Sequence, residues 1–281
     1  MSKTKTANTR ARKKTRLTRD TADKHLLYQW SVQNPEFEVE LMEKVYKKGT
    51  GRKPLILRED FCGTALTASE WVKSDGAREA IGLELDEATL EWGTIRNIQP
   101  LGEHASRVDL RLQDVRSITR PLADVACALN FSYYLFSDFQ DLVGYFRMVR
   151  HSLRAGGIVF LDSYGGWESQ QVKDEPREVE GPEGTFTYVW DQADYNPVDN
   201  MALCHIHFRF KKGKPWKKAF TYNWRLYTPA EVRDALLAAG FKSVESYWDH
   251  EDDDDKDDDY RKTERIENSA AWITYIVGRK D

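Results

Sequence analysis

Residues 55–65 read Leu-Ile-Leu-Arg-Glu-Asp-Phe-Cys-Gly-Thr-Ala, and residues 80–86 read Ala-Ile-Gly-Leu-Glu-Leu-Asp. The first stretch is an apolar strand that enters a tight turn of small residues, and the second is an apolar strand that ends on an acid about twenty residues beyond Gly63. A βαβ unit of this kind holds an adenosine-type cofactor, with Glu84 as acceptor for both ribose hydroxyls. Phe61 and Ala65 stand where a dinucleotide-binding loop has glycines, so the loop suits a nucleoside that lacks a pyrophosphate.

These residues resemble motif I and the following acidic motif of the class I S-adenosylmethionine-dependent methyltransferases. The resemblance matches Glu59 to the motif acid, Cys62-Gly63-Thr64 to the loop core and Glu84 to the ribose-binding acid. It extends to an acid near the adenine, in residues 113–115, and to the fourth and fifth strands, in residues 123–130 and 153–161. It implies S-adenosyl-L-methionine as the cofactor, bound by Glu59, Phe61, Cys62, Gly63, Thr64, Glu84, Leu85, Asp114, Val115 and Asn130.

Length and composition restrict the class of protein. A chain of 281 residues can form one large core and an elaboration of it, which predicts a catalytic domain with a cap. The net charge of −4 gives no global indication of a nucleic-acid or membrane partner. Three cysteines without metal-ligand spacing favour a reducing compartment, and no apolar run approaches the ~18 residues of a membrane span. We therefore expect a soluble, cytoplasmic protein with no metal site.

Charge is distributed unevenly along the chain. Residues 1–19 contain eight Lys or Arg and no acid, which predicts a disordered basic tail over residues 1–20. The tail is either solvated or an electrostatic arm for nucleic acid or another polyanion. An acidic run in loop 250–260 predicts an exposed, solubilising insertion, with a weak divalent-cation site or a contact with the basic tail as alternatives.

Strand and helix patterns alternate between these extremes. The predicted helices and strands of residues 21–165 are helix 23–32, helix 35–47, strand 54–59, helix 64–73, strand 79–85, helix 87–98, strands 108–112 and 123–129, a helix that Ser137 caps and Gly156 ends, and strand 157–163. Residues 166–227 predict an antiparallel insertion of about three strands, at 184–190, 201–211 and 217–227. Residues 228–281 add a helix that begins at the capping box of Thr228 and ends at Gly240, and strands 243–248 and 271–278. The fold class is therefore α/β, a Rossmann-like doubly wound seven-stranded sheet with its last strand antiparallel and an inserted antiparallel β cap.

Methyl transfer from a sulfonium needs alignment of the reacting atoms in a dry pocket and no obligatory acid–base pair. Acceptor-side residues are expected at the end of the fourth strand, in residues 130–134, and in the inserted sheet. We predict Tyr133, His207 and Arg225 as catalytic residues. His205 and His207 share one strand face with Arg209, and that face either converges on the acceptor or is solvated. We expect Trp190 and Trp224 to be core residues.

These patterns predict a methyltransferase that uses S-adenosylmethionine and a small-molecule acceptor. Two alternatives remain open at this point. One is a methyltransferase for a nucleic acid or a protein, in which the basic arm binds a polyanion, and the other is a non-catalytic nucleoside-binding scaffold protein. The aromatic content of the insertion favours a compact acceptor, because it suits a lid over a pocket.

Overall fold

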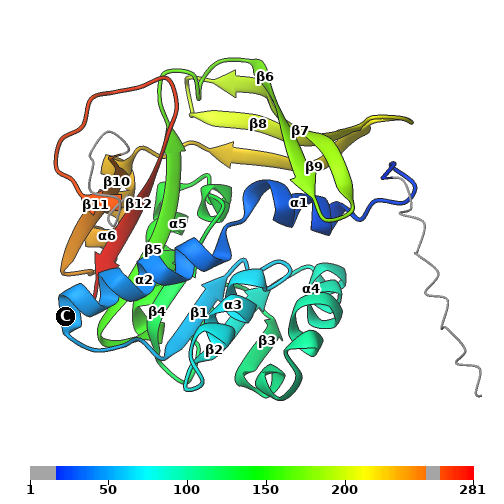
Figure 1. Ribbon diagram of the computed structural model, residues 1–281. Coiled ribbons are helices and arrows are strands. Elements are labelled where there is room, and N and C mark those ends of the chain that lie inside the picture. The colour runs from blue at the N-terminus through cyan, green and yellow to red at the C-terminus, as the bar shows by residue number, and fades with distance from the viewer. Residues whose placement is uncertain (1–16, 251–259) are drawn as a thin grey trace, which may run out of the picture.

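An eight-stranded sheet and a four-stranded sheet make up the molecule (Figure 1). The computed structural model describes residues 17–250 and 260–281, so most of the predicted basic tail and of the acidic loop lies outside the described residues. The large sheet has the strand order β11-β10-β12-β5-β4-β1-β2-β3, and the smaller one has the order β6-β7-β8-β9. The predicted α/β fold with an antiparallel cap is confirmed.

The strands of the large sheet are β1 (Ile56–Asp60), β2 (Glu79–Glu84), β3 (Val108–Leu112), β4 (Ala123–Ala128), β5 (Leu153–Gly165), β10 (Ser243–Asp249), β11 (Tyr260–Lys262) and β12 (Trp272–Arg279). The cap strands are β6 (Lys173–Gly181), β7 (Gly184–Asn196), β8 (Met201–Phe210) and β9 (Trp216–Arg225). The helices are α1 (Lys24–Val32), α2 (Pro35–Thr50), α3 (Leu66–Ser74), α4 (Glu87–Gly93), a π-helix (Thr94–Ile98), 3₁₀ segments (Gln99–Arg107 and Ser132–Leu135), α5 (Phe139–Ser152) and α6 (Pro229–Ala238).

Strands β5, β4, β1 and β2 form the buried centre of the large sheet, and β3 pairs in parallel with β2 at the edge. Strand β1 pairs in parallel with β2 and β4, and β4 pairs in parallel with β5. All six residues of β4 are buried because helices cover both faces: α2 and α3 pack with one apolar cluster, and α5 and α6 pack with the other. Strand β12 enters antiparallel between β5 and β10. The carboxyl ends of β1, β2 and β4 therefore meet at one edge, where α/β sheets bind ligands.

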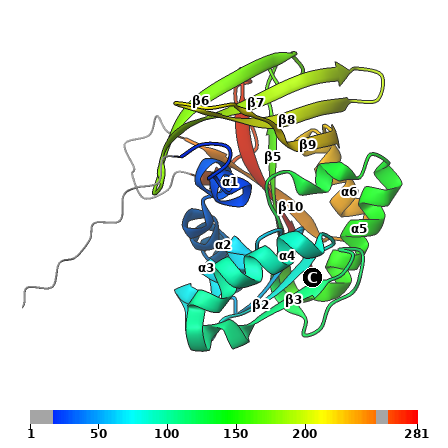
Figure 2. The same cartoon turned by 90° about the vertical axis from the view of Figure 1, so that its right-hand side faces the viewer.

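The cap lies over this edge of the large sheet, with α1 between the two sheets (Figures 1 and 2). Leu27 of α1 packs in one apolar cluster with Phe186, Ile206 and Phe208 of the cap. Strand alternation explains this contact, since even-numbered residues of β8 face the interior and odd-numbered ones face outward. The cap thus shares one apolar cluster with α1 and, through Trp224 of β9, another with the large sheet.

Four sequence-based expectations require correction. The cap has four strands and not about three, since β6 pairs with β7 at the edge of the small sheet. Strand β6 carries Pro176 and many charged residues, which are typical of edge strands and give no alternating apolar pattern in the sequence. The short β11 adds an eighth strand to the large sheet. Asp138, not Ser137, caps α5, since its side chain accepts from the amides of residues 140 and 141. Helix α5 ends at Ser152, and Gly156 lies inside β5 with a left-handed φ of 74°.

A buried ion pair lies within the cofactor-type βαβ unit. Arg58 and Asp60 are fully buried and joined by a hydrogen bond of 2.7 Å, and the Tyr145 hydroxyl donates to the second Asp60 oxygen at 2.8 Å. The remaining Arg58 donors reach the carbonyls of Val115 and Ser117. The guanidinium therefore connects β1 to the segment that follows β3, across the carboxyl edge of the sheet.

Replacing Arg58 by Ala should lower the free energy of unfolding by about 3–5 kcal/mol, because Asp60 then keeps a buried, uncompensated charge. Urea denaturation followed by circular dichroism measures the change. Arg111→Ala is the matched control, since this arginine pairs with an exposed aspartate on the outer strand β3 and its loss should cost less than about 1 kcal/mol. Equal losses for the two variants would contradict a specific role for the Arg58 network.

Candidate functional site

The turn after β1 forms the first wall of the site. Phe61, Gly63 and Ala65 all adopt left-handed conformations, with φ of 54°, 52° and 56°. The Cys62 amide donates to the Leu83 carbonyl at 2.9 Å, which ties the turn to β2. A Cβ placed on Gly63 would meet nothing nearer than 4.0 Å, so the space in front of the turn is open. Such a turn gives a ligand close access to backbone N–H groups.

The Glu84 carboxylate closes the turn from the end of β2. One oxygen accepts from the Gly63 amide at 2.9 Å, and the other accepts from the amides of Leu85 and Asp86 at 2.8 and 2.9 Å. A carboxylate has about four lone-pair sites, so three backbone donors leave room for a further hydrogen bond. The structure therefore brings the predicted loop and the predicted acid together and leaves Glu84 able to accept from a ligand hydroxyl.

Glu59, which the sequence predicts to bind the cofactor, contacts helix α3 in the structure. Its carboxylate lies beneath the turn, is 5% exposed and accepts from the Ala68 amide in the first turns of α3 at 2.8 Å. Burial raises the pKa of Glu59 to about 8, and the hydrogen bonds from the Ala68 amide and the Thr67 side chain oppose that rise. Glu59 thus anchors α3 behind the loop.

Two further elements border the loop. On one side, Asp114 pairs with Arg116 at 2.6 Å and Val115 is buried, its carbonyl held by Arg58. On the other side, Gln29 of α1 donates to the Thr64 hydroxyl at 2.8 Å inside the protein. Helix α1 therefore contacts the loop directly, and the sequence had given no sign of this contact.

A second left-handed turn follows β4. Asn130 and Phe131 have φ of 56° and 58°, which is uncommon for residues other than glycine. The Asp162 carboxylate of β5 accepts from both amides, at 2.6 and 2.9 Å, and the carboxylate is buried. Burial raises the pKa of Asp162 to about 7. Asp162 therefore fixes a strained turn at the point where the cofactor-type edge meets the cap.

A cavity of about 1190 Å³ begins at this turn and extends between the large sheet and the cap. Asn130, Phe131 and Tyr164 line it from the large sheet. Eight further aromatic side chains contribute to the wall: Tyr28 of α1, Tyr188 and Trp190 of β7, Tyr222 and Trp224 of β9, and Trp248, Tyr260 and Trp272 at the β10–β12 side. Its volume is somewhat above the roughly 300–1,000 Å³ that is usual for a small-molecule pocket.

Several rings of the wall contact one another, and charged side chains, Arg265 among them, share the lining. The rings of Tyr222 and Trp224 stack at 4.3 Å between centroids, and Phe131 meets Trp224 edge-on at 6.2 Å. The Trp224 Nε1–H is buried and has no hydrogen-bond partner among the described residues. Carboxylates of Glu175, Asp249 and Glu267 also lie in the lining. Trp190 and Trp224, expected to be core residues, are therefore cavity walls as well as members of the packed cluster.

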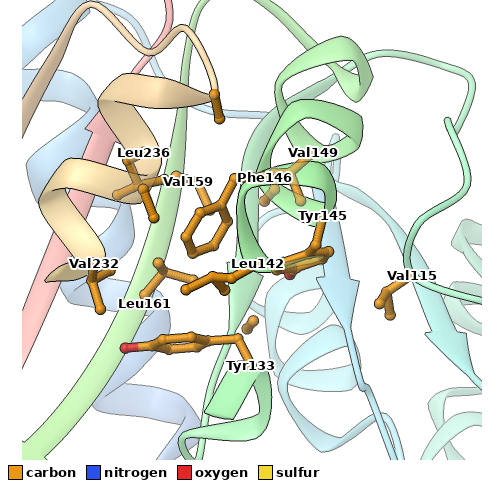
Figure 3. Close-up of a cluster of buried hydrophobic side chains, with 14 of the residues drawn as sticks. Val115, Tyr133, Leu142, Tyr145, Phe146, Val149, Val159, Leu161, Val232 and Leu236 are labelled. Carbon is orange, nitrogen blue, oxygen red and sulfur yellow. The ribbon is translucent and has the colours of Figure 1, made fainter. Parts of the chain in front are cut away.

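The predicted catalytic Tyr133 lies in the core. It is fully buried among side chains of α5, α6 and the large sheet (Figure 3), and its hydroxyl donates to the Asp162 carbonyl at 2.9 Å. It does not line the cavity. This placement corrects the sequence-based assignment, because a hydroxyl held in the packed core cannot touch an acceptor.

The other two predicted catalytic residues also lie outside the cavity. Ile206 of β8 lines the cavity, so the adjacent His207 faces outward; its Nε2 lies 3.0 Å from Asp191 and its Nδ1 accepts from the Lys218 amide at 2.8 Å. Arg225 donates to the Ser137 carbonyl at 3.0 Å. His207 thus supports the bulge where β9 departs from β8, and Arg225 fastens the cap to the loop before α5.

Sequence reasoning missed Asp162, although the sequence carries a signal for it. The fifth strand is apolar up to Leu161 and then contains one acid that is followed by Ser163. An acid at the carboxyl end of a buried strand, as in β2, indicates a ligand or backbone contact at that edge. Tyr28, Trp248 and Trp272 carried no such signal, because their meeting depends on how separate elements pack.

Two searches for other kinds of site gave negative results. Within residues 17–250 and 260–281, no group of three or more His, Cys, Asp or Glu side chains is placed to hold a metal ion. None of the helices in that part of the chain is long and apolar enough to cross a membrane.

Comparison with solved structures shows what the fold is. DesVI of Streptomyces venezuelae superposes with a TM-score of 0.67 at 17% identity, over 92% of this chain and 96% of that one. CalS10 of Micromonospora echinaspora is an S-adenosylmethionine-bound amino pentose methyltransferase of calicheamicin biosynthesis. It superposes with a TM-score of 0.65 at 14% identity, over 91% of this chain and 96% of that one. The sugar N-methyltransferase KedS8 of Streptoalloteichus superposes with a TM-score of 0.63 at 16% identity, over 100% of this chain and 98% of that one. No protein-family model and no curated protein sequence matches. The chain has the fold of the S-adenosylmethionine-dependent methyltransferases.

Replacing Asp162 by Asn should lower the free energy of unfolding by about 1–3 kcal/mol, because one backbone amide of the strained turn then faces an amide N–H₂. The loss should depend on pH. The Asp162 pKa is near 7 in the folded protein and about 3.9 when unfolded, so the wild type loses stability as pH rises between these values, whereas the variant lacks this effect. The difference in the free energy of unfolding between wild type and Asp162→Asn should therefore decrease from pH 5 to pH 8.

Urea denaturation at several pH values tests this expectation. Asp109→Asn on β3 serves as the control, because that side chain is exposed, and its difference from wild type should stay below about 0.5 kcal/mol at every pH. If the difference in the free energy of unfolding between wild type and Asp162→Asn stays constant or increases with pH, Asp162 does not titrate between pH 5 and pH 8.

Proposed function

We propose that this protein is a methyltransferase that uses S-adenosylmethionine to methylate a small molecule. The observation that carries the proposal is the junction of two sites: the open left-handed turn at Gly63 with the Glu84 carboxylate, and the aromatic cavity that begins at Asn130. The fold of the solved methyltransferases supports it. In this proposal the turn, Glu84, Leu85 and the segment at Asp114 and Val115 hold the nucleoside.

The residues of the chain have three tasks in such a reaction. S-adenosylmethionine supplies a methyl group on a sulfonium, which becomes a neutral thioether when the methyl leaves. Asn130 and Phe131, fixed by Asp162, separate the cofactor side from the acceptor side. The aromatic wall excludes water and limits how the acceptor lies, which accounts for much of the rate of an in-line displacement.

We propose an amine as the acceptor. A neutral amine attacks the methyl carbon and becomes an ammonium as the C–S bond breaks. Tyr and Trp faces stabilise that cation by about 0.5–2 kcal/mol each, and Glu175, Asp249 and Glu267 outnumber Arg265 in the lining. The unpartnered Trp224 N–H offers a hydrogen bond to an acceptor oxygen. Two of the similar structures are an amino pentose methyltransferase and a sugar N-methyltransferase, which supports a hydroxylated amine as the acceptor in this proposal.

Replacing Glu84 by Ala should weaken S-adenosylmethionine binding at least about tenfold, because hydrogen bonds to a charged acceptor contribute roughly 1.5–3 kcal/mol. Calorimetry on the purified protein, without added metal, measures the affinity. Glu79→Ala is the matched control, since Glu79 lies at the opposite, exposed end of the same strand. Unchanged binding in folded Glu84→Ala protein would refute the ribose assignment, and no binding by the wild type would refute the function.

Replacing Trp224 by Phe keeps an aromatic ring and removes the N–H, so the acceptor KM should rise about 3–10-fold while the affinity for S-adenosylmethionine stays unchanged. A labelled-methyl assay over a panel of amino sugars and simple amines identifies the acceptor and gives the KM. Arg209→Gln on the outer face of β8 is the control and should leave both constants unaltered. A rise in KM for Arg209→Gln but not for Trp224→Phe would place the acceptor on the outer face.

A further inference from the structure

Helix α2 carries a buried acid, Glu38, whose carboxyl group has no partner among the described residues. Glu38 is 6% exposed, and no hydrogen bond or ion pair joins its carboxyl group to any residue in the part of the chain that the structure describes. Burial and the carboxylates of Asp162 and Glu59 raise the pKa of Glu38 well above its usual range, and no cation opposes that rise. A buried, unpartnered carboxyl group destabilises a fold, so its presence indicates a ligand.

Glu38 lies over the carboxyl edge of the large sheet, on the face that α2 covers. Glu59 of β1 and Cys127 of β4 are register partners, and so are Asp162 of β5 and Tyr275 of β12. Register partners point to the same face, and Cys127 and Tyr275 belong to the apolar cluster under α2 and α3. Burial raises the pKa values of Cys127 and Tyr275, and the charge of Glu38 adds to both rises. The three acids therefore lie together at the ends of β1, β4 and β5.

The other buried acids of this edge are already bonded. Glu59 and Asp162 accept backbone amides. Asp60, which alternates to the opposite face of β1, is held by a guanidinium and by a phenol hydroxyl. Of these four buried acids, Glu38 is the one whose full hydrogen-bonding capacity is left for a ligand.

The covalent structure of S-adenosylmethionine brings a cation to the same place. In the proposed function, Glu84 at the end of β2 holds the ribose, and the methyl group reaches the cavity that begins at Asn130 after β4. The sulfonium joins the methyl group, the ribose and the amino-acid chain, so the amino-acid end must also lie near the ends of β1 and β4. That end carries an α-ammonium group, which has three N–H donors and one positive charge.

We propose that Glu38 binds the α-ammonium group of S-adenosylmethionine. This inference rests on the proposed function and adds to it a cofactor contact from α2. Glu38 does not line the aromatic cavity, so an amine in that cavity is the less suitable partner. A hydrogen bond between an ammonium group and a buried carboxylate is charge-assisted and is therefore among the stronger hydrogen bonds in proteins.

Calorimetry with two ligands and two variants tests this proposal. The ligands are S-adenosylhomocysteine, which keeps the ammonium group, and its deaminated analogue, in which a hydrogen atom replaces the amino group. The variants are Glu38→Gln and, as the matched control, Glu36→Gln, which changes an exposed acid in the first turn of the same helix. Both substitutions nearly preserve the size of the side chain and remove one carboxyl group.

Glu38→Gln should bind S-adenosylhomocysteine at least about tenfold more weakly than wild type, because a hydrogen bond between two charged groups is lost. Its affinity for the deaminated analogue should stay within about threefold of wild type, since that ligand has no ammonium group. Glu36→Gln should bind both ligands as wild type does. An equal loss for the two ligands in Glu38→Gln, or no loss for either, would overturn the proposal.

Proton release on binding gives a second readout. A bound ammonium group would lower the raised pKa of Glu38 again, so binding of S-adenosylhomocysteine should release protons and strengthen as pH rises. Binding enthalpies in buffers of different ionisation enthalpy measure this release, which should be smaller in Glu38→Gln than in wild type. Equal release in the two proteins would contradict the proposal, because Glu59 and Asp162 would then account for it.

Urea denaturation of the ligand-free proteins separates binding from folding. Because Glu38 is buried beside two other acids, Glu38→Gln should have a urea midpoint at or above that of wild type. A lower midpoint together with an equal loss of affinity for the two ligands would identify a purely structural role.

Failure of this inference can be told apart from failure of the proposed function. If wild type binds S-adenosylhomocysteine and loses affinity in Glu84→Ala but not in Glu38→Gln, the function stands and the role of Glu38 is refuted. If wild type binds neither S-adenosylhomocysteine nor S-adenosylmethionine, both are refuted.

Discussion

Carboxylates that accept backbone amides hold the carboxyl edge of the large sheet together. Parallel strands end there with N–H groups that point away from the ladder, and each must find an acceptor. Glu84 accepts from the turn after β1, Glu59 accepts from the start of α3, and Asp162 accepts from the turn after β4. The left-handed turns at Phe61 and at Asn130 and Phe131 persist because these bonds offset their strain. The shape of both candidate sites depends on them.

The two faces of the cap carry different kinds of side chains. Its inner face places aromatic rings over the carboxyl edge and shares a core with α1. Its outer face carries His205, His207 and Arg209, where His207 accepts the amide of a residue in the β9 bulge. His207 has a structural role, since its Nδ1 accepts the backbone amide of Lys218 in the bulge and its Nε2 is directed at Asp191.

The ligand pocket is therefore assembled from separate parts of the chain. Helix α1 reaches the cofactor loop through Gln29 and the cavity through Tyr28, so it connects both halves of the site. Strands β10 and β12 bring Trp248 and Trp272 to within 4.9 Å of one another, ring to ring, at the far wall. A cavity lined from α1, the cap and the last strands forms only when all three have docked, so its shape depends on the complete fold.

Local patterns in the sequence determined the elements and the cofactor edge. The spacing of Gly63 and Glu84 reports a turn and a strand end that are neighbours in one βαβ unit, so short-range chemistry is enough to identify them. The alternation of strands and helices likewise determined the parallel sheet, and the aromatic strands after Tyr164 determined the cap.

Only the tertiary structure decided which side chains face the cavity. Alternation along β8 places His207 and Ile206 on opposite faces, but the choice of the inner face depends on packing against α1. Tyr133 lies next to the Asn130 turn in sequence, yet the 3₁₀ segment turns it into the core. Asp162 and Trp272 contribute from distant parts of the chain. The sequence by itself determined the scaffold and the proposed cofactor edge, because both follow from local periodicity, whereas the aromatic cavity depends on how separately formed elements pack.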